Sequence, residues 1–289
     1  MRKRNKENVF RSKVNWRKEL TLLPGYLILT IWVAFTAAFL IWILGASLST
    51  SREIFTGTVF KFESGVHFEN YASAWKGNNV SVYFANSLLY AVSSCIVVIL
   101  ISAPAAYVLS RFTFLGNKGV KTGLILAMSI PEVMIIMPIY SLTAQYHIRG
   151  RILLIILYIL LRVPFTTTYL LNFFASLSRS YEEAAAIDGC SPEGTFFRII
   201  LPLLKPVIVT VTILNGMWIW NDYLLPSLML GQNGKVKTLP VAVQAFVGSY
   251  VKQWDLILTA ALLAMIPMII VFLLAQKQIM NGMVEGAIK

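Results

Sequence analysis

The sequence predicts an all-α membrane protein with about six transmembrane helices. Of its 289 residues 57% are hydrophobic and 13% are charged, which is too little charge to cover the surface of a soluble domain. Apolar runs of roughly 20 residues, the length that crosses ~30 Å of hydrocarbon, recur along the chain. We place the six spans at 23–46, 82–109, 120–142, 152–174, 204–229 and 256–276.

The first span follows a basic stretch, as the core of a secretory signal does. It is longer than the 7–15 residues of such a core, so we interpret it as an uncleaved span. The chain then divides into a basic N-terminal segment, 1–22, a transmembrane domain, 23–276, and a C-terminal tail, 277–289. The longest segment between spans, 47–81, has room for a short helix or a pair of strands but not for an independent core.

Lysine and arginine predict the orientation, because they gather on the cytoplasmic side of membrane proteins. With a cytoplasmic N-terminus, that side carries sixteen of them and the outer side eight, with Arg162 inside a span. Most of the difference lies in the N-terminal segment. We therefore expect both termini and the loop between spans four and five to lie in the cytoplasm.

Composition and motifs exclude several other functions. The net charge of +12 comes from basic residues beside apolar runs, which argues against nucleic-acid binding. Cys95 lies in a span and Cys190 in a polar loop, so we expect two free thiols. We find neither metal-ligand spacing nor a catalytic Ser/His/Asp or Cys/His set. The run 231–238 lacks the glycine spacing and the Lys-Ser/Thr pair of a phosphate loop.

Proline occurs in or beside most spans. A proline removes one helical hydrogen bond, and membrane helices tolerate this where neighbouring groups satisfy the freed carbonyl. Ordinary helix packing explains such positions, and flexing of some of these helices during gating is the alternative. The prolines concerned are Pro104, Pro131, Pro138, Pro164, Pro226 and Pro267.

A charged loop at 180–202 interrupts the apolar pattern. Ser180 and Glu183 fit a capping box and predict a helix from Tyr181, which Asp188 and Gly189 would end. Ser191-Pro192 predicts a second helix start, and Pro202 marks the return to the membrane. Such a helical hairpin could simply lie on the membrane. The alternative is a docking surface, to which its small and acidic residues would contribute: Glu182, Glu183, Ala184, Ala185, Asp188 and Gly189.

The spacing of Glu183-Ala184-Ala185, Gly189, Ile199, Leu201 and Pro202 resembles the loop by which permease subunits of bacterial ABC importers dock onto their ATPase. Further motifs along nearly the whole chain resemble the second permease of maltose-type and multiple-sugar importers. They include Glu69-Asn70-Tyr71, Asn86-Ser87-Leu88, Leu201-Pro202-Leu203 and Trp220-Asn221-Asp222-Tyr223. The chain departs from the family at Ser178-Arg179-Ser180, where an Ile-Pro lead-in is more usual, and at Asp222, where glutamate is common.

The resemblance implies a non-catalytic subunit of an alternating-access sugar importer. A second homologous permease would complete the translocation path, and an external solute-binding protein would deliver the sugar. A pair of ATPase subunits, which would bind the ATP and magnesium, would seat the 180–202 loop. The C-terminal tail would also contact the ATPases. We expect no cofactor in this chain itself.

Charged residues inside spans need a partner or water, because a charge costs ~2.5–3.5 kcal/mol at the membrane centre. Glu132 and Arg162 fall at similar depth in adjacent spans, which predicts an ion pair; the alternative is that each lines a wet cavity. Trp220, Asn221, Asp222 and Tyr223 could line a sugar path, although an aromatic belt has the same composition.

Three other functions compete with a sugar permease. An importer for another solute, such as a peptide or polyol, would keep the docking loop. A secondary transporter or channel would not need the loop, and its transport would survive loss of the ATPase. A membrane-anchored assembly subunit would be dispensable for growth on the solute. The loop argues against the last two.

Overall fold

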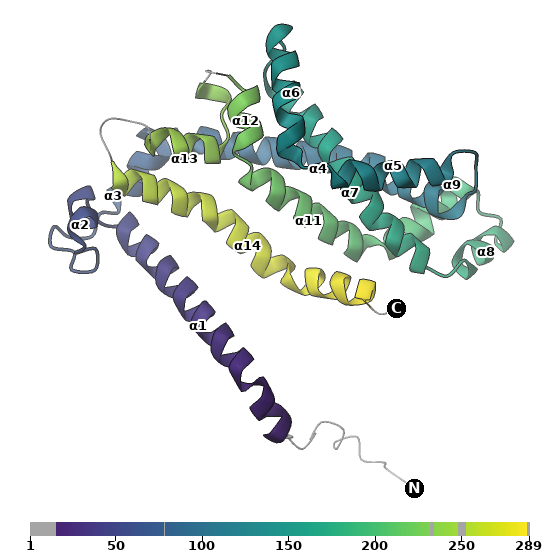
Figure 1. Ribbon diagram of the computed structural model, residues 1–289, viewed down its shortest axis with the longest axis horizontal. Coiled ribbons are helices and arrows are strands. Elements are labelled where there is room, and N and C mark those ends of the chain that lie inside the picture. Colours follow the sequence, from purple (N-terminus) through teal and green to yellow (C-terminus); the bar gives the residue numbers. More distant parts are fainter. Residues whose placement is uncertain (1–15, 78, 232–233, 248–252, 288–289) are drawn as a thin grey trace.

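The computed structural model describes residues 16–77, 79–231, 234–247 and 253–287. All regular structure in these residues is helical (Figure 1). The long helices are α1 (Trp16–Ser47), α4 (Val80–Arg111), α7 (Arg151–Ser176) and α14 (Trp254–Ala287). The shorter elements are α2 (Ser51–Thr56), α3 (Glu69–Ala72), η1 (Ser73–Gly77), α5 (Asn117–Ser129), α6 (Glu132–Gln145), α8 (Ser180–Ile187), α9 (Pro192–Thr195), η2 (Phe196–Ile200), α10 (Leu201–Leu203), α11 (Lys205–Asn221), α12 (Leu224–Met229), η3 (Gly234–Val236) and α13 (Leu239–Val247).

Within the described residues, four helices are long and apolar enough to cross a membrane, and up to six spans result if each of two bent helix pairs counts as one. The four long helices match the predicted spans one, two, four and six. One bent pair is α5 with α6, and the other joins 192–203 to α11. The class of fold is therefore the predicted one, an all-helical membrane protein.

The third and fifth spans are not the continuous helices that we predicted. Helices α5 and α6 meet at 90°, because Pro131 disfavours a helical conformation in the residue before it and Ile130 is accordingly extended, at φ −82° and ψ 122°. The fifth span ends at Asn221, where Asp222 is extended and α12 begins afresh two residues later. Pro104 and Pro164, in contrast, lie inside unbroken helices.

Helix α4 is the centre of the bundle, and its most extensive packing is against α7, with α11 on another side. The hairpin of α8 and α9 lies at one end of the molecule, on the right in Figure 1, and α2 and α3 lie at the opposite end. Two apolar clusters along these helices hold the bundle together. One surrounds Tyr90 and Tyr158, and the other joins Tyr107 and Phe174 to Phe196 beneath the hairpin.

Helix α1 diverges from the bundle (Figure 1). It meets α14 near the end that carries α2, and only 6% of its apolar span is buried. The predicted N-terminal segment 1–22 lies mostly outside the described residues, with α1 beginning at Trp16. The predicted tail, 277–289, continues α14 as helix through Ala287. The segment 47–81 forms short helices rather than strands.

Candidate functional site

The hairpin at 180–203 begins and ends for local reasons, most of which the sequence predicts. Gly189 adopts φ +78° in the turn after α8, a backbone conformation that glycine takes without steric cost. The Ser191 hydroxyl accepts a hydrogen bond from the Gly194 N–H at 3.1 Å, and Pro192 occupies the first turn of α9. The predicted stop at Gly189 and the second start at Ser191-Pro192 are thus confirmed.

The capping box predicted for α8 is absent, and that prediction was wrong. Ser180 is already helical, Arg179 is the N-cap, and no side chain caps the helix from that position. The Ser178 hydroxyl instead accepts a hydrogen bond from the Ser180 N–H at 3.2 Å. A complete capping box does form at Thr50 and Glu53 in α2, so the four-residue pattern alone does not select the site.

The two faces of the hairpin differ in what they expose. Ala185 is buried on a helix that packs against α9 and η2, so in this conformation it does not face outward with Ala184 and Gly189. Ile199 and Leu201 are half-buried and pack on the cluster around Phe196. Their side chains therefore anchor the hairpin to the bundle, whereas Ala184, Asp188, Gly189 and Pro202 remain exposed.

Sequence reasoning missed the most exposed apolar side chain of the hairpin. Ile187 lies at the end of α8 with 87% of its surface exposed, and Tyr181 is 47% exposed on the same helix. An isoleucine directly before Asp188-Gly189, in an otherwise polar turn, was the available signal. The tip of the hairpin thus presents an apolar residue beside the acidic Asp188.

Glu182 and Glu183 are adjacent but have different environments. Glu183 is exposed and free to meet a partner. Glu182 accepts a hydrogen bond from Nε of Arg111, at the end of α4, at 2.6 Å. In this conformation its carboxylate is mostly shielded from solvent and bonds within the chain.

The structure brings Glu132 and Arg162 together. Nη1 of Arg162 lies 3.7 Å from Oε1 of Glu132. Glu132 is the first residue of α6, directly after the bend between α5 and α6. The stronger partner of Arg162 is Asn215 on α11, whose side-chain oxygen accepts a hydrogen bond from Nε at 2.9 Å. Asn215 also donates to Oγ1 of Thr166 at 2.8 Å. Sequence reasoning missed this link between α7 and α11.

Aromatic rings complete the environment of Arg162. Its guanidinium lies 4.8 Å from the ring centroids of both Phe165 and Trp218, an arrangement that stabilises a partly desolvated cation. A cavity of about 220 Å³ lies beside it, between α5, α6 and α7, and Glu132 and Arg162 both line it. A charged and aromatic surface of this kind can hydrogen-bond hydroxyl groups and stack on apolar ring faces.

The four residues expected along a sugar path separate into two pairs. Trp220 is 4% exposed, and its indole N–H donates to the backbone oxygen of Ala264 at 3.1 Å. Asp222 accepts hydrogen bonds from Tyr158 at 3.0 Å and from the backbone N–H of Leu224 at 3.0 Å. Both therefore serve packing and capping in this conformation.

Only Asn221 and Tyr223 of that motif are exposed. They lie at the end of α11, on either side of the extended Asp222.

Cys95 and Cys190 are free thiols, as the sequence predicts, the first buried and the second half-buried.

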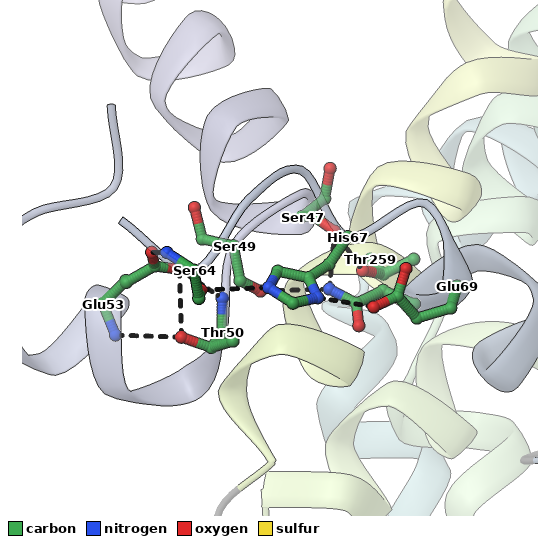
Figure 2. Close-up of polar contacts among 9 residues, drawn as sticks. Ser47, Ser49, Thr50, Glu53, Ser64, His67, Glu69 and Thr259 are labelled. Atoms are coloured by element: carbon green, nitrogen blue, oxygen red, sulfur yellow. Dashed lines mark hydrogen bonds and ion pairs between the residues drawn. The ribbon is translucent and has the colours of Figure 1, made fainter. Parts of the chain in front are cut away.

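A second polar cluster fixes the opposite end of the molecule (Figure 2). The Glu53 carboxylate accepts hydrogen bonds from the backbone N–H groups of Thr50, at 2.8 Å, and Ser64, at 3.0 Å. These bonds lower the pKa of Glu53 to about 2. Asn70 donates to the backbone oxygens of Ser47 and Ser49, so the segment after α1 is tied firmly to the start of α3.

Within this cluster Ser64, His67 and Glu69 are arranged like a hydrolytic triad. Nε2 of His67 lies 3.0 Å from the Ser64 hydroxyl, and Nδ1 hydrogen-bonds Glu69, which lowers the pKa of Glu69. The backbone N–H groups that could stabilise an oxyanion are used elsewhere, since that of Ser64 bonds Glu53 and that of Gly65 bonds Phe62. The arrangement is therefore structural.

The described residues form an all-helical membrane bundle with a helical hairpin between α7 and α11, which places the chain among polytopic membrane proteins. The comparisons with known proteins agree. Residues 96–284 match the family model of the binding-protein-dependent transport system inner membrane component. The chain belongs to this family, in its carbohydrate-uptake branch, as a non-catalytic, multi-pass inner membrane permease of an ABC transporter.

Several sugar-transport permeases are similar to this chain over most of their length. A probable starch degradation products transport permease of Thermoanaerobacterium thermosulfurigenes is 32% identical, over 96% of this chain and 99% of its own. The multiple sugar-binding transport permease of Streptococcus mutans is 31% identical over the whole of both chains. A bacterial ABC transporter that imports alginate shares the fold, with a TM-score of 0.75 at 21% identity, over 90% of this chain and 97% of that one.

Proposed function

We propose that this permease moves a sugar or oligosaccharide across the membrane by alternating access, driven by a separate ATPase that binds the hairpin at 180–203. The observation that carries the proposal is the exposure of Ile187, at 87%, on a hairpin inserted between α7 and α11. Ile187 lies beside the exposed Asp188 and Gly189, so the tip of the hairpin offers a partner an apolar side chain, a carboxylate and an accessible backbone turn together. The similarity to starch-product, melibiose and multiple-sugar permeases supports a carbohydrate as the solute.

The remaining partners follow from the same proposal. A second permease would complete the translocation path, and an external solute-binding protein would deliver the sugar. The paired ATPase subunits would bind ATP and magnesium. The divergence of α1 from the bundle and its nearly full exposure are consistent with further protein or lipid around it.

The experiment is purification of the assembled transporter from mild detergent through a tag on this chain. We expect Ile187→Glu to lose the ATPase, because it places a charge in the centre of the proposed contact. Leu115→Glu is the matched control, since Leu115 is fully exposed in the neighbouring loop between α4 and α5, outside the hairpin. Retention of the ATPase by both variants would refute docking through the hairpin.

We further propose that both termini and the hairpin are cytoplasmic. Cys190 offers a direct test because it lies in the hairpin and is half-buried, whereas Cys95 is buried. In a Cys95→Ala chain, a membrane-impermeant thiol reagent should label Cys190 in inside-out vesicles and not in intact cells. Labelling in intact cells would reverse the orientation.

For the path of the solute, we propose the exposed Asn221 and Tyr223 together with the cavity beside Glu132 and Arg162. Asn221→Ala and Glu132→Gln should raise the KM for transport with the assembly intact. Trp220→Phe is the control, because Trp220 is buried and should affect stability rather than KM. Unchanged KM values in the first two variants would exclude these residues from the path.

A further inference from the structure

Arg111, the last residue of α4, binds both sides of the junction between α7 and the hairpin. Its Nε donates to Oε1 of Glu182 at 2.6 Å, in the first turn of α8. Its Nη2 donates to the backbone oxygen of Leu177 at 3.0 Å, at the end of α7. One guanidinium therefore fixes the angle at which α8 leaves α7.

This ion pair is shielded from solvent, with side-chain exposures of 8% for Arg111 and 18% for Glu182. An exposed ion pair is screened and contributes little, whereas removing one member of a buried pair leaves an uncompensated charge and is strongly destabilising locally. Glu183, the next residue, is exposed. Glu182 therefore faces α4, whereas Glu183 faces outward.

Apolar contacts reinforce the same connection. Tyr107, one turn before Arg111, has its ring centroid 5.6 Å from that of Phe174 on α7 and 5.0 Å from that of Phe196 on η2. The end of α4 is therefore packed against both limbs of the hairpin base. A displacement of the hairpin base therefore displaces α4 or breaks the contacts of Tyr107 and the Arg111–Glu182 bond.

The other end of α4 holds a segment on the far side of the molecule. Asn86 donates to the backbone oxygens of Lys235 and Lys237 at 2.9 and 3.0 Å, and Tyr90 donates to that of Val236 at 2.8 Å. Since α4 is one helix of 32 residues, it spans ~48 Å at 1.5 Å per residue. It connects the hairpin directly to residues 235–237.

We propose that Arg111 is a positioning residue that transmits movement of the hairpin, through α4, to the 235–237 segment at the opposite face. This inference rests on the proposed docking of an ATPase at the hairpin, and it assigns Glu182 to transmission and Glu183 to the partner. Without the Arg111–Glu182 pair, α8 would still bind the ATPase, but much less of its movement would reach the far end, because the contacts of Tyr107 would join α4 to the hairpin base without the ion pair.

The test uses the purified transporter with its ATPase and a reporter at Gly234→Cys, in a chain carrying Cys95→Ala and Cys190→Ser. Gly234 is exposed, and an added Cβ meets nothing within 4 Å. The rate of maleimide labelling is measured with and without ATP and vanadate. In the parent chain the nucleotide should change this rate, and in Arg111→Ala and Glu182→Gln the change should shrink about fivefold or more, with ATPase content unaltered.

The double variant Arg111→Glu with Glu182→Arg should recover much of the response, which a general folding defect would not do. Glu183→Gln should keep the nucleotide-dependent change in the labelling rate at Gly234→Cys in those transporters that retain the ATPase. Full responses in Arg111→Ala and Glu182→Gln would overturn the inference, and so would loss of the ATPase from Glu182→Gln, because Glu182 would then be a partner contact. Retention of the ATPase by Ile187→Glu would instead refute the proposed docking.

Discussion

Replacing Asn215 by leucine should lower the free energy of unfolding by about 2 kcal/mol. Asn215 is fully buried and joins α11 to α7 through Nε of Arg162, at 2.9 Å, and Oγ1 of Thr166, at 2.8 Å. A hydrogen bond to a charged group contributes ~1.5–3 kcal/mol, and a neutral bond between membrane helices averages ~0.6 kcal/mol. Leucine has a similar size, so the loss of these bonds dominates the change.

The Arg162 guanidinium keeps other partners in the Asn215→Leu variant. The expected loss of stability is therefore near the lower end of the range obtained by adding the energies of the two lost hydrogen bonds. Oε1 of Glu132 remains 3.7 Å away, and the rings of Phe165 and Trp218 still flank it. About 2 kcal/mol corresponds to a roughly 30-fold change in the unfolding equilibrium at 25 °C.

The assay is reversible unfolding of the chain in mixed micelles of a mild detergent and dodecyl sulfate, followed by tryptophan fluorescence. Thr167→Val is the control on the partner helix α7, beside Thr166, because Oγ1 of Thr167 is buried without a hydrogen-bond partner in the part of the chain that the structure describes. Because valine has nearly the same shape and removes the unsatisfied hydroxyl, this variant should be at least as stable as the wild type. An Asn215→Leu variant as stable as the wild type would refute the reasoning.

Three further predictions concern single side chains. Gly189→Ala should lower the free energy of unfolding by about 1–2 kcal/mol, since φ at Gly189 is +78°. Gly119→Ala, inside α5 with nothing within 4 Å of an added Cβ, should raise it by about 0.5–1 kcal/mol. Thermal unfolding of the two variants measures both changes. Because the pKa of Glu53 is lowered to about 2 from 4.5, its contribution to the stability of this segment should be complete above pH 4.5 and lost as the pH falls toward 2. Hydrogen-exchange protection factors in residues 50–64, in which the intrinsic pH dependence of amide exchange is divided out, should fall over this range, and Glu53→Gln should remove that fall. Tyr158→Phe should cost about 0.6–1.5 kcal/mol through its lost bond to Asp222, and equal stability in the same micelle assay would contradict this.

The sequence predicted those features of the hairpin that are set by residues close together in the chain. Gly189 and Ser191-Pro192 act through their own backbone conformation and through bonds to groups within three residues. The helix end and the helix start that they produce can therefore be predicted from the sequence. The predicted capping box at Ser180 failed because Ser178 supplied a competing hydroxyl two residues earlier. The choice between two local bonds depends on the angle at which α7 ends, which the pattern does not contain.

The break in the third span shows a partial signal. Pro131 was recognised as a point where the helix could bend, but the same reasoning applied to Pro104 and Pro164, whose helices continue unbroken. A proline removes one hydrogen bond in each case. Whether the helix bends by 90° or continues is decided by the packing of the segments on either side.

The sequence alone determined the class of this protein, because hydrophobic runs of membrane length and the spacing around Glu183 and Gly189 are properties of contiguous residues. Counting residues along the third and fourth spans also predicted that Glu132 lies near Arg162, and the two side chains do meet, although the third span bends by 90° before Glu132 and is not the straight helix that the count assumed. Only the tertiary structure decided the rotation of each helix about its axis. That rotation turns Ala185 inward and Ile187 outward, and it brings Arg111 to Glu182 across 71 residues of chain.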